Sequence, residues 1–390
     1  MLYIMKRTAA VLLSAAIALT ASACSLFSPD QNDPQATSAK ETAAASQTEP
    51  ESGDPQELLK KTVKQKDFSG VVYITKGGEK LCESVTGFAD SDSGRLINIE
   101  TQFCIASVSK QFTAACIMLL QEQGLLSVYD TLDGYFPEYN EGADITIQSL
   151  LTMTSGIPDH TSSADNPGRA AESPDELGYS LSPDASPGEN RAAALDWIFS
   201  EPLMFEPGSQ YNYCNTNYLL LAQIVEQVSG ENYEDFVTEN IFDPLGMVHT
   251  GFAESIDDFQ NLALTPAQND REQFYGIVKS GIARGAGDIV STARDLDLWL
   301  TSLREYTVLS PESVEEMTKD YSPGDNSYGY GLVVNLFGGF GHSGQIGSYA
   351  SFAYTNPDAE YNFFAVTNDS GSMFGEISEL AAKIIEDTMT

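Results

Sequence analysis

Short runs of alternating apolar and polar residues lie near both ends of the chain. Residues 70–75 (GVVYIT) and 80–86 (KLCESVT) flank the segment KGGE, and this arrangement predicts a β-hairpin. The last third of the chain has the same pattern and predicts three further strands, at residues 330–336, 345–354 and 361–368. Strands are therefore expected at both ends of the folded part.

The middle of the chain, residues 113–280, has the periodicity of helices. Apolar residues recur at i, i+3, i+4 and i+7 just after residue 110 and predict a helix with one buried face that ends at Gly124. A second helix of this kind is expected to end at Gly230. The polar segment 159–190 predicts a long loop. The apolar residues of the two helices are Phe112, Ala115, Cys116 and Leu119 in the first and Leu221, Ile224, Val225 and Val228 in the second.

Strands at the ends and helices between them predict an α+β fold. We expect one antiparallel sheet, built from both ends of the chain and flanked by helices, with a helix-rich subdomain. Short helices at residues 57–66 and 376–389 are expected to open and close this domain. The domain is assigned to residues 57–390, its sheet part to 57–112 and 281–390, and its helical part to 113–280.

The first 56 residues have a different composition. Residues 1–23 combine a short positive start, the apolar run TAAVLLSAAIALT and small residues at the end, which is the organisation of a secretory signal peptide. The sequence ASAC, ending at Cys24, resembles a bacterial lipobox, whose cysteine receives lipid and becomes the mature N-terminus. Ordinary cleavage nearby, with a free Cys24, is the alternative. Residues 24–56 are rich in Ser, Thr, Ala, Gln, Pro and acidic residues and predict a flexible tether. We therefore expect an exported protein on the bacterial cell surface, lipid-anchored to the membrane or secreted.

Composition and charge narrow the possible functions. Hydrophobic residues make up 42% of the chain, enough to fill a sizeable core. The chain has 20 basic and 56 acidic residues and a net charge of −36. Such a surface repels phosphate backbones and argues against nucleic-acid binding and against adsorption to anionic lipids. We expect a monomer that contacts the membrane through its anchor and takes a small molecule or a peptide as substrate.

Four cysteines follow Cys24 and are widely spaced, without a CxxC pair. Two disulfides are conceivable in an exported protein. Because a domain of this size needs no cross-links, small buried thiols are the favoured interpretation. The four residues are Cys82, Cys104, Cys116 and Cys214.

Ser107 and Lys110 lie three residues apart where the first central helix is expected to begin. Residues i and i+3 share one face of a helix, so the hydroxyl and the amine can touch. A serine becomes a nucleophile when a neighbour takes its proton, and a lysine can do this when burial keeps its amine neutral. The helix N-terminus also offers backbone N–H groups to a developing oxyanion. Such a pair arises often by chance, and a solvated helix start is the alternative.

Tyr213 and Asn215 precede the second amphipathic helix in the sequence YNYCN. A phenol near an ammonium can share or relay a proton, and an amide can orient a lysine and a substrate carbonyl. Taken alone, the motif is better explained by a buried Tyr213 and by Asn215 as a helix cap.

His342, Ser343 and Gly344 enter the expected strand that begins at Gln345. The free edge of a strand can bind an extended acyl chain, and the N–H of Gln345 could serve as an oxyanion donor. His342 could supply a hydrogen-bond donor, or a positive charge at low pH, to a substrate carboxylate. A packed or surface histidine is the commoner case.

The same region, GFGHSG, fits the pattern GxGxxG of dinucleotide-binding proteins. That motif needs a strand before it and a helix after it, whereas a strand is expected to follow here, so we reject this interpretation. His160, His249 and His342 show no metal-binding spacing. We expect neither a metal nor a cofactor.

The three motifs, in this order and at these separations, resemble those of the serine β-lactamase and penicillin-binding peptidase superfamily. The resemblance is greatest to the class C-like branch, which also includes D,D-carboxypeptidases, D-aminopeptidases and β-lactamase-like esterases. It extends over about residues 60–390 and includes the segments FCIASVSKQFTAACIMLLQEQGLLSVYDTL, IQSLLTMTSGIPDH, FEPGSQYNYCNTNYLLLAQIVE and GHSGQIGSYASF.

This resemblance implies a role for each motif residue. Ser107 would be the acylated nucleophile and Lys110 its partner. Tyr213 would be the general base or a proton relay, and Asn215 would orient Lys110 and the substrate. The reaction implied is hydrolysis of an amide or ester through an acyl-enzyme.

The third motif departs from the family pattern. His342-Ser343-Gly344 stands where many relatives carry Lys-Thr-Gly, and the N–H groups of Ser107 and Gln345 are the implied oxyanion hole. Histidine in place of lysine removes a permanent positive charge. If His342 acts as a cation, activity on substrates with a carboxylate should fall above about pH 6.5.

The substrate classes are ranked on this basis. D-amino-acid peptides or cell-wall peptides come first, small esters second and β-lactams third. A tethered protein that binds penicillin or peptidoglycan with little turnover is the alternative from another functional class.

Overall fold

The computed structural model describes residues 54–66, 68–171, 174–182, 184–253, 259–266, 279–324, 326–336 and 338–369. The expected signal peptide, Cys24, most of the tether and the expected helix at 376–389 lie outside the described residues.

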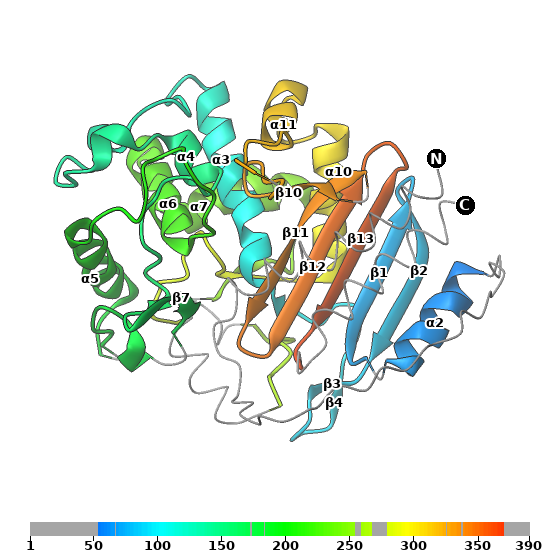
Figure 1. The fold of residues 1–390 in the computed structure, drawn as a ribbon. Helices are drawn as coiled ribbons and strands as arrows, with labels where there is room; N and C mark the ends of the chain where they lie inside the picture. Colours follow the sequence, from blue (N-terminus) through cyan, green and yellow to red (C-terminus); the bar gives the residue numbers. More distant parts are fainter. Residues whose placement is uncertain are drawn as a thin grey trace, which may run out of the picture.

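A six-stranded antiparallel sheet forms one side of the domain, with strand order β10-β11-β12-β13-β1-β2 (Figure 1). β1 pairs with β13, from Val71 opposite Val366 to Lys76 opposite Tyr361, so the two ends of the described chain meet in the middle of the sheet. The expected α+β fold, with an antiparallel sheet built from both ends, is confirmed. The strands are β1 (Gly70–Lys76), β2 (Glu79–Thr86), β10 (Val333–Leu336), β11 (Gly339–Ile346), β12 (Tyr349–Asn356) and β13 (Tyr361–Thr367).

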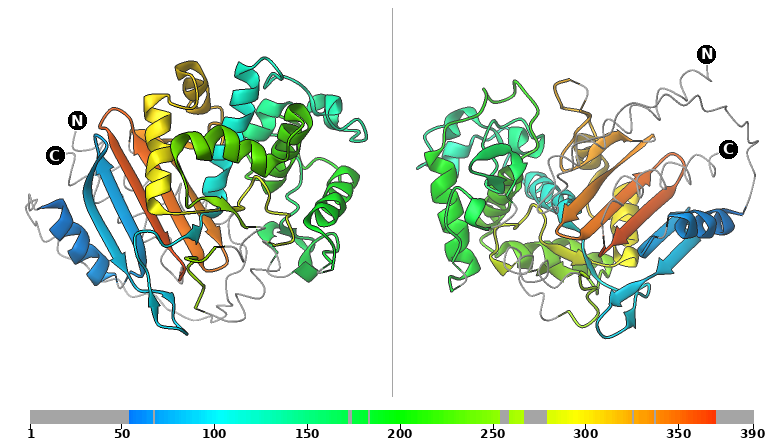
Figure 2. Two further views of the ribbon diagram at one scale, coloured as in Figure 1. Left: turned by 180° about the vertical axis from the view of Figure 1, so that it is seen from behind. Right: turned by 60° about the horizontal axis from the view of Figure 1, so that its bottom comes forward.

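Alternate residues of the sheet pack into two different cores. Val72 and Phe363 face the helix α2 (Pro55–Gln65), whereas Val71 and Phe364 face the main core of the molecule. Figure 2 shows α10 (Ala293–Glu305) lying across the main-core face of the sheet. Because both faces are covered, β12 and β13 are buried along their whole length.

The strand pattern near the C-terminus differs from the prediction in one place that matters for the site. Residues 345–354 do not form one strand, because β11 ends at Ile346 and a tight turn leads into β12. Gly347 has φ +54°, a left-handed conformation that glycine adopts without strain. β12 is buried on both faces and does not alternate, so alternation could not mark its start, and the pair Gly347-Ser348 was the readable turn signal. The expected strand at 330–336 begins later, at Val333.

The helical part packs beside the sheet, with α3 (Lys110–Glu122) standing between the two (Figure 1). Every residue from Lys110 to Met118 is buried, so α3 is a central helix and not one with a single buried face. Phe112 stacks on Trp299 at 4.5 Å between ring centroids, which ties α3 to α10. α6 ends at Gly230 with φ +77°, as its sequence predicts.

The other helices and small strands surround this centre. The helices are α4 (Ile147–Leu151), α5 (Pro187–Ser200), α6 (Asn215–Ser229), α7 (Tyr233–Val237), α8 (Asp243–Leu245) and α11 (Pro311–Met317). The short 3-10 or π turns are η1 (Ala106–Ser109), η2 (Leu132–Gly134), η3 (Gly142–Asp144), η4 (Pro174–Glu176) and η5 (Thr238–Phe242). The small sheets pair β3 (Phe88–Asp90) with β4 (Arg95–Leu96), β6 (Ser162–Ser163) with β7 (Asn166–Ala170), and β9 (Ile289–Ser291) with both β5 (Phe103–Cys104) and β8 (Gly251–Phe252).

The expected loop at 159–190 contains local structure. β6 and β7 form a small hairpin, and α5 begins before the loop was expected to end. The start of α5 has a capping box in which Ser186 accepts from the N–H of Glu189 and the Glu189 carboxylate accepts from the N–H of Ser186. The spacing of Ser186 and Glu189, three residues apart, is a capping-box pattern that the sequence itself contains. No helix in the described part of the chain is long and apolar enough to cross a membrane.

All four cysteines in the described ranges are buried and unbridged, which confirms the interpretation as buried thiols. Burial raises the pKa of Cys82 to about 12 and raises that of Cys104, Cys116 and Cys214 further. We expect the thermal unfolding midpoint to be the same with and without dithiothreitol. A structural disulfide contributes about 2–4 kcal/mol, so a fall of several degrees in reductant would contradict this assignment.

Candidate active site

Ser107 lies in the short turn η1, between β5 and α3, and is 6% exposed. The preceding residue, Ala106, has φ +49°, which is unfavourable for a residue with a side chain. The turn is held from two sides. The N–H of Ile105 donates to Ile289 of β9 (3.0 Å), and the hydroxyl of Ser351 in β12 donates to the Ile105 carbonyl (2.7 Å). Neighbouring strands therefore hold Ala106, directly before Ser107, in an unusual backbone conformation.

Lys110 is completely buried at the first residue of α3, and its amine contacts three oxygen atoms. Nζ lies 2.7 Å from the carbonyl oxygen of Ala286, 2.8 Å from Oδ1 of Asn215 and 3.2 Å from Oγ of Ser107. The first two oxygens can only accept hydrogen bonds. A neutral amine would use its two N–H bonds there, which directs its lone pair at the Ser107 hydroxyl. The geometry suits a proton acceptor for Ser107.

Tyr213 and Asn215 approach Lys110 from the start of α6. Nζ of Lys110 lies 4.9 Å from the ring centroid of Tyr213 and 5.5 Å from that of Tyr218. Both rings would stabilise an ammonium after proton transfer. Asn215 is the first residue of α6, and Cys214 before it is the N-cap. The alternative interpretation, in which Asn215 is the N-cap of this helix, is therefore wrong.

Gly344 brings the edge of β11 against the nucleophile turn. β10 pairs with β11 through Gly339 and Gly341 in the described chain, so the later part of β11 faces η1 and not β10. A Cβ atom at Gly344 would lie 2.3 Å from the Ile105 carbonyl oxygen and 2.8 Å from the backbone nitrogen of Ser107. Only glycine permits this approach. The next residue, Gln345, follows on the same strand edge.

His342 is 2% exposed and lies inside β11, where burial and the nearby charge of Lys110 lower its pKa to about 3. Its Nδ1 contacts the carbonyl oxygen of Ser343 and must carry the proton, because a carbonyl only accepts. Nε2 then accepts from the hydroxyl of Tyr328, at 3.0 Å. The expectation of a cationic His342 at mildly acidic pH is wrong, because a buried imidazole with both nitrogens engaged stays neutral.

Two aromatic residues near the site, Tyr211 and Tyr328, were not predicted from the sequence to have a role there. The ring of Tyr328 lies edge-on to Tyr213, with centroids 6.4 Å apart, and 5.8 Å from the ring of Tyr211. Tyr328 is fully buried and Tyr211 is half-buried. Together they form an aromatic wall beside the Lys110 site. Tyr328 comes from a loop far away in sequence, so no local motif could reveal it.

Asp159 and Thr161 lie behind Asn215. The Asp159 carboxylate accepts from the backbone N–H and the side-chain amide of Asn215, at 2.9 and 3.2 Å. The same amide donates to Thr161 Oγ1 at 2.9 Å. Both residues follow the segment TSGIP, to which the sequence analysis assigned no role.

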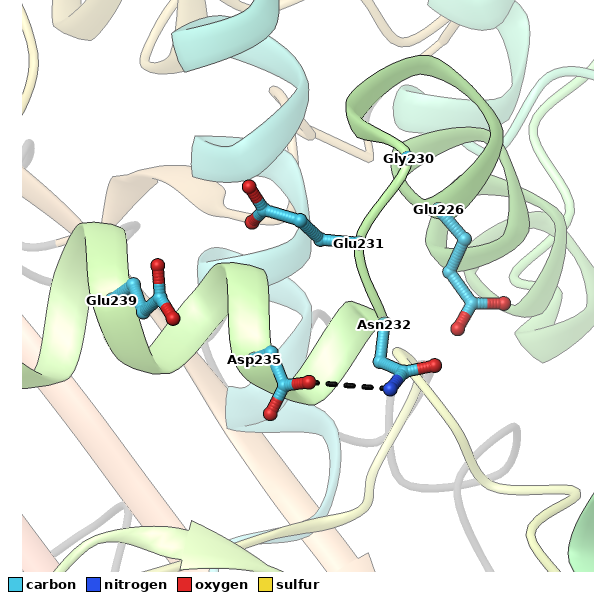
Figure 3. Close-up of a pocket in the computed structure, with 6 residues that line it drawn as sticks. All are labelled: Glu226, Gly230, Glu231, Asn232, Asp235 and Glu239. Atoms are coloured by element: carbon cyan, nitrogen blue, oxygen red, sulfur yellow. Dashed lines mark hydrogen bonds between the residues drawn. The ribbon is translucent and has the colours of Figure 1, made fainter.

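A separate acidic pocket of about 600 Å³ lies at the far end of α6 (Figure 3). Since α6 has 15 residues and is about 22 Å long, this pocket is remote from Asn215 at the start of the helix. Its carboxylates point in different directions in Figure 3. Within the described residues, no cluster of His, Cys, Asp or Glu side chains could hold a metal ion. The residues lining the pocket are Glu226, Gly230, Glu231, Asn232, Asp235 and Glu239.

The family model described as Beta-lactamase matches residues 55–385, and the chain belongs to that family. Its fold is that of the serine β-lactamase and penicillin-binding protein superfamily. The putative penicillin-binding protein PbpX of Bacillus subtilis is 30% identical over 76% of this chain and 69% of its own length. Of two further curated relatives, penicillin-binding protein 4* of Bacillus subtilis and protein flp of Staphylococcus aureus, the match covers 62% of the length.

Two solved structures are similar over most of the chain. D-amino acid amidase from Ochrobactrum anthropi SV3, complexed with L-phenylalanine amide, has a TM-score of 0.70 and 25% identity over 86% of this chain and 97% of the amidase. The octameric penicillin-binding protein homologue from Pyrococcus abyssi has a TM-score of 0.69 and 26% identity over 84% of this chain and 76% of the homologue. The expected resemblance to this superfamily is confirmed.

We expect the ring of His342 to stay neutral between about pH 5 and 8, because its pKa is lowered to about 3. Histidine-selective NMR, with His342→Gln to assign the signal, measures this directly. Between about pH 3 and 6.5 the unfolded chain binds a proton at this residue that the folded chain does not. The free energy of unfolding therefore falls as the pH drops below about 6.5, and His342→Gln should reduce that fall. A ring that titrates near pH 6.5 would contradict the assignment.

Proposed function

We propose that this protein is a serine hydrolase that forms an acyl-enzyme on Ser107, acting on D-amino-acid peptides or amides, cell-wall peptides or small esters. The observation that carries the proposal is the three-way contact of Lys110. Its two shorter hydrogen bonds go to oxygens that only accept, so the remaining position on the amine faces Ser107 Oγ. No cofactor is needed for this chemistry.

The reaction has two halves. Ser107 Oγ attacks the substrate carbonyl carbon, and its proton passes to Nζ of Lys110. The backbone N–H groups of Ser107 and Gln345 are proposed to hold the oxyanion of the tetrahedral intermediate. Its collapse breaks the bond to the leaving amine or alcohol, which takes a proton from Lys110, directly or through the Tyr213 hydroxyl. Water then attacks the acyl-enzyme with the same groups acting in reverse, and releases the acid and free Ser107.

The neutral His342 supports amides and esters over β-lactams, which bind through a free carboxylate. Both its ring nitrogens are engaged within the protein, so it offers no cation to such a group. The chain's net charge of −36 also disfavours the approach of anionic substrates. One similar structure is described as a D-amino acid amidase, which supports D-amino-acid derivatives as the first class to test.

Ser107→Ala should lower hydrolysis of a D-amino-acid amide and a p-nitrophenyl ester at least about 1,000-fold, because no other group replaces the nucleophile. The exposed Ser200→Ala is a matched control and should leave the rate unchanged. Nitrocefin in the same assay measures the β-lactamase alternative. Full hydrolysis by Ser107→Ala would contradict the proposal. Stable labelling of Ser107 by fluorescent penicillin, with no turnover of any substrate, would favour the binding-protein alternative.

We also propose that the chain is exported and anchored to the bacterial membrane by lipid on Cys24. The support is the sequence of residues 1–56, with its signal peptide, lipobox-like ASAC and tether. Palmitate labelling should mark the protein in the membrane fraction, and Cys24→Ser should abolish the label and release active protein. Unlabelled wild-type protein in the medium would support simple secretion instead. A monomer remains our expectation for the assembly.

A further inference from the structure

We infer that Asp159, assisted by Thr161, is a positioning residue that fixes the amide of Asn215 and through it aims the amine of Lys110 at Ser107. The inference rests on the proposed function. It assigns a role to two residues that belong to none of the three sequence motifs. They act by deciding which end of one buried amide faces the lysine.

The Asp159 carboxylate accepts four hydrogen bonds and has a side chain only 9% exposed. Oδ1 accepts from the N–H and the hydroxyl of Thr161, at 2.8 and 2.7 Å. Oδ2 accepts from the backbone N–H and the side-chain amide of Asn215, at 2.9 and 3.2 Å. Each carboxylate oxygen thus meets two donors. This arrangement suits an acceptor-only group and no other.

The orientation of the Asn215 amide follows from these partners. Its Nδ2 donates to Asp159 Oδ2 and to Thr161 Oγ1, which accounts for both amide hydrogens. The carbonyl end, Oδ1, is therefore turned toward Nζ of Lys110 at 2.8 Å. Thr161 can accept this hydrogen because its own hydroxyl hydrogen is given to Asp159. A flipped amide would place its N–H groups against Lys110 and its carbonyl oxygen against the Asp159 carboxylate, where two acceptors would face each other.

This orientation decides whether Lys110 can act as a base. With Oδ1 facing it, a neutral amine donates one hydrogen to Asn215 and one to Ala286, and its lone pair faces Ser107. If the amide were flipped, the lone pair would turn toward the amide hydrogens. Two hydrogen bonds, from Asn215 to Asp159 and from Lys110 to Asn215, therefore connect the carboxylate to the amine that takes the proton.

A purely structural role is the competing explanation, because Asp159 also accepts from the first N–H of α6. The two roles differ in the pH profile. The other titratable groups around Lys110 are Tyr213, Tyr218, His160 and His342. Burial lowers the pKa of both histidines, and that of His342 to about 3, so His342 does not produce an acidic limb between about pH 5 and 8. We expect the acidic limb of kcat/KM to follow deprotonation of the Lys110 site, because only the neutral amine can take the proton of Ser107.

Asp159→Asn is the sharpest variant, since it keeps the shape, removes the charge and replaces one acceptor oxygen with an NH₂ group. We expect kcat/KM for a D-amino-acid amide or p-nitrophenyl ester to fall at least about ten-fold. The acidic limb should move to lower pH by about one unit, because a buried negative charge near the ammonium is gone. The exposed Asp144→Asn is the matched control and should show neither change.

Thr161→Val provides a second variant that keeps the charge. It removes the acceptor for one hydrogen of Asn215, so kcat/KM should fall while the acidic limb stays in place. If Asp159→Asn proves unstable by thermal unfolding, this variant still tests the positioning role.

The outcomes separate the two proposals. If wild type hydrolyses none of the substrates and Ser107 takes no fluorophosphonate label, the proposed function fails. If wild type is active and both Asp159→Asn and Thr161→Val retain its rate and pH profile, only the positioning role is overturned. An activity loss proportional to the loss of folded protein, with an unmoved acidic limb, also overturns it in favour of the helix-cap role.

Discussion

The burial of Lys110 is the constraint on which the rest of the site depends. An amine with no exposed surface needs acceptors close by, because leaving a buried polar group without a partner costs several kcal/mol. Its hydrogen-bonding partners come from three separate segments, at Ser107, Asn215 and Ala286. The start of α3, the start of α6 and the loop before β9 must therefore converge at one point. Hydrogen bonding to the buried amine of Lys110 therefore brings the residues of the candidate site together.

The sheet supplies the second part of the arrangement. Ala106 is held with a positive φ, and the hydroxyl of Ser351 in β12 ties the same turn to the sheet. Gly344 lets the edge of β11 come close to the backbone of Ser107. A strained turn of this kind persists only where its surroundings fix it from several sides. The antiparallel sheet, whose strands β12 and β13 are buried on both faces, does this, while Asn215 and Tyr213 approach Lys110 from the helical part.

Features that depend on residues close together in the sequence were predicted, whereas features that depend on distant residues were not. The helix ends at Gly124 and Gly230 and the hairpin of β1 and β2 follow from local patterns, and the structure has them in the expected places. The hairpin of β11 and β12 was missed because β12, buried on both faces, has no alternation that could mark where it begins. His342 was misjudged because a residue's charge depends on its burial, which neighbouring residues in sequence do not reveal.

By itself, the sequence determined the family, the α+β class and the short spacings of the motifs, since these depend on residue types close together along the chain. Serine and lysine three residues apart are enough to place a hydroxyl beside an amine. Only the tertiary structure decided which way that amine points and which groups beside it are charged. The contacts of Asp159 with Asn215, and of Tyr328 with His342, join segments that no local pattern connects. Hydrogen-bond direction is decided by three-dimensional packing, because an amide or an imidazole takes its orientation from the partners that surround it.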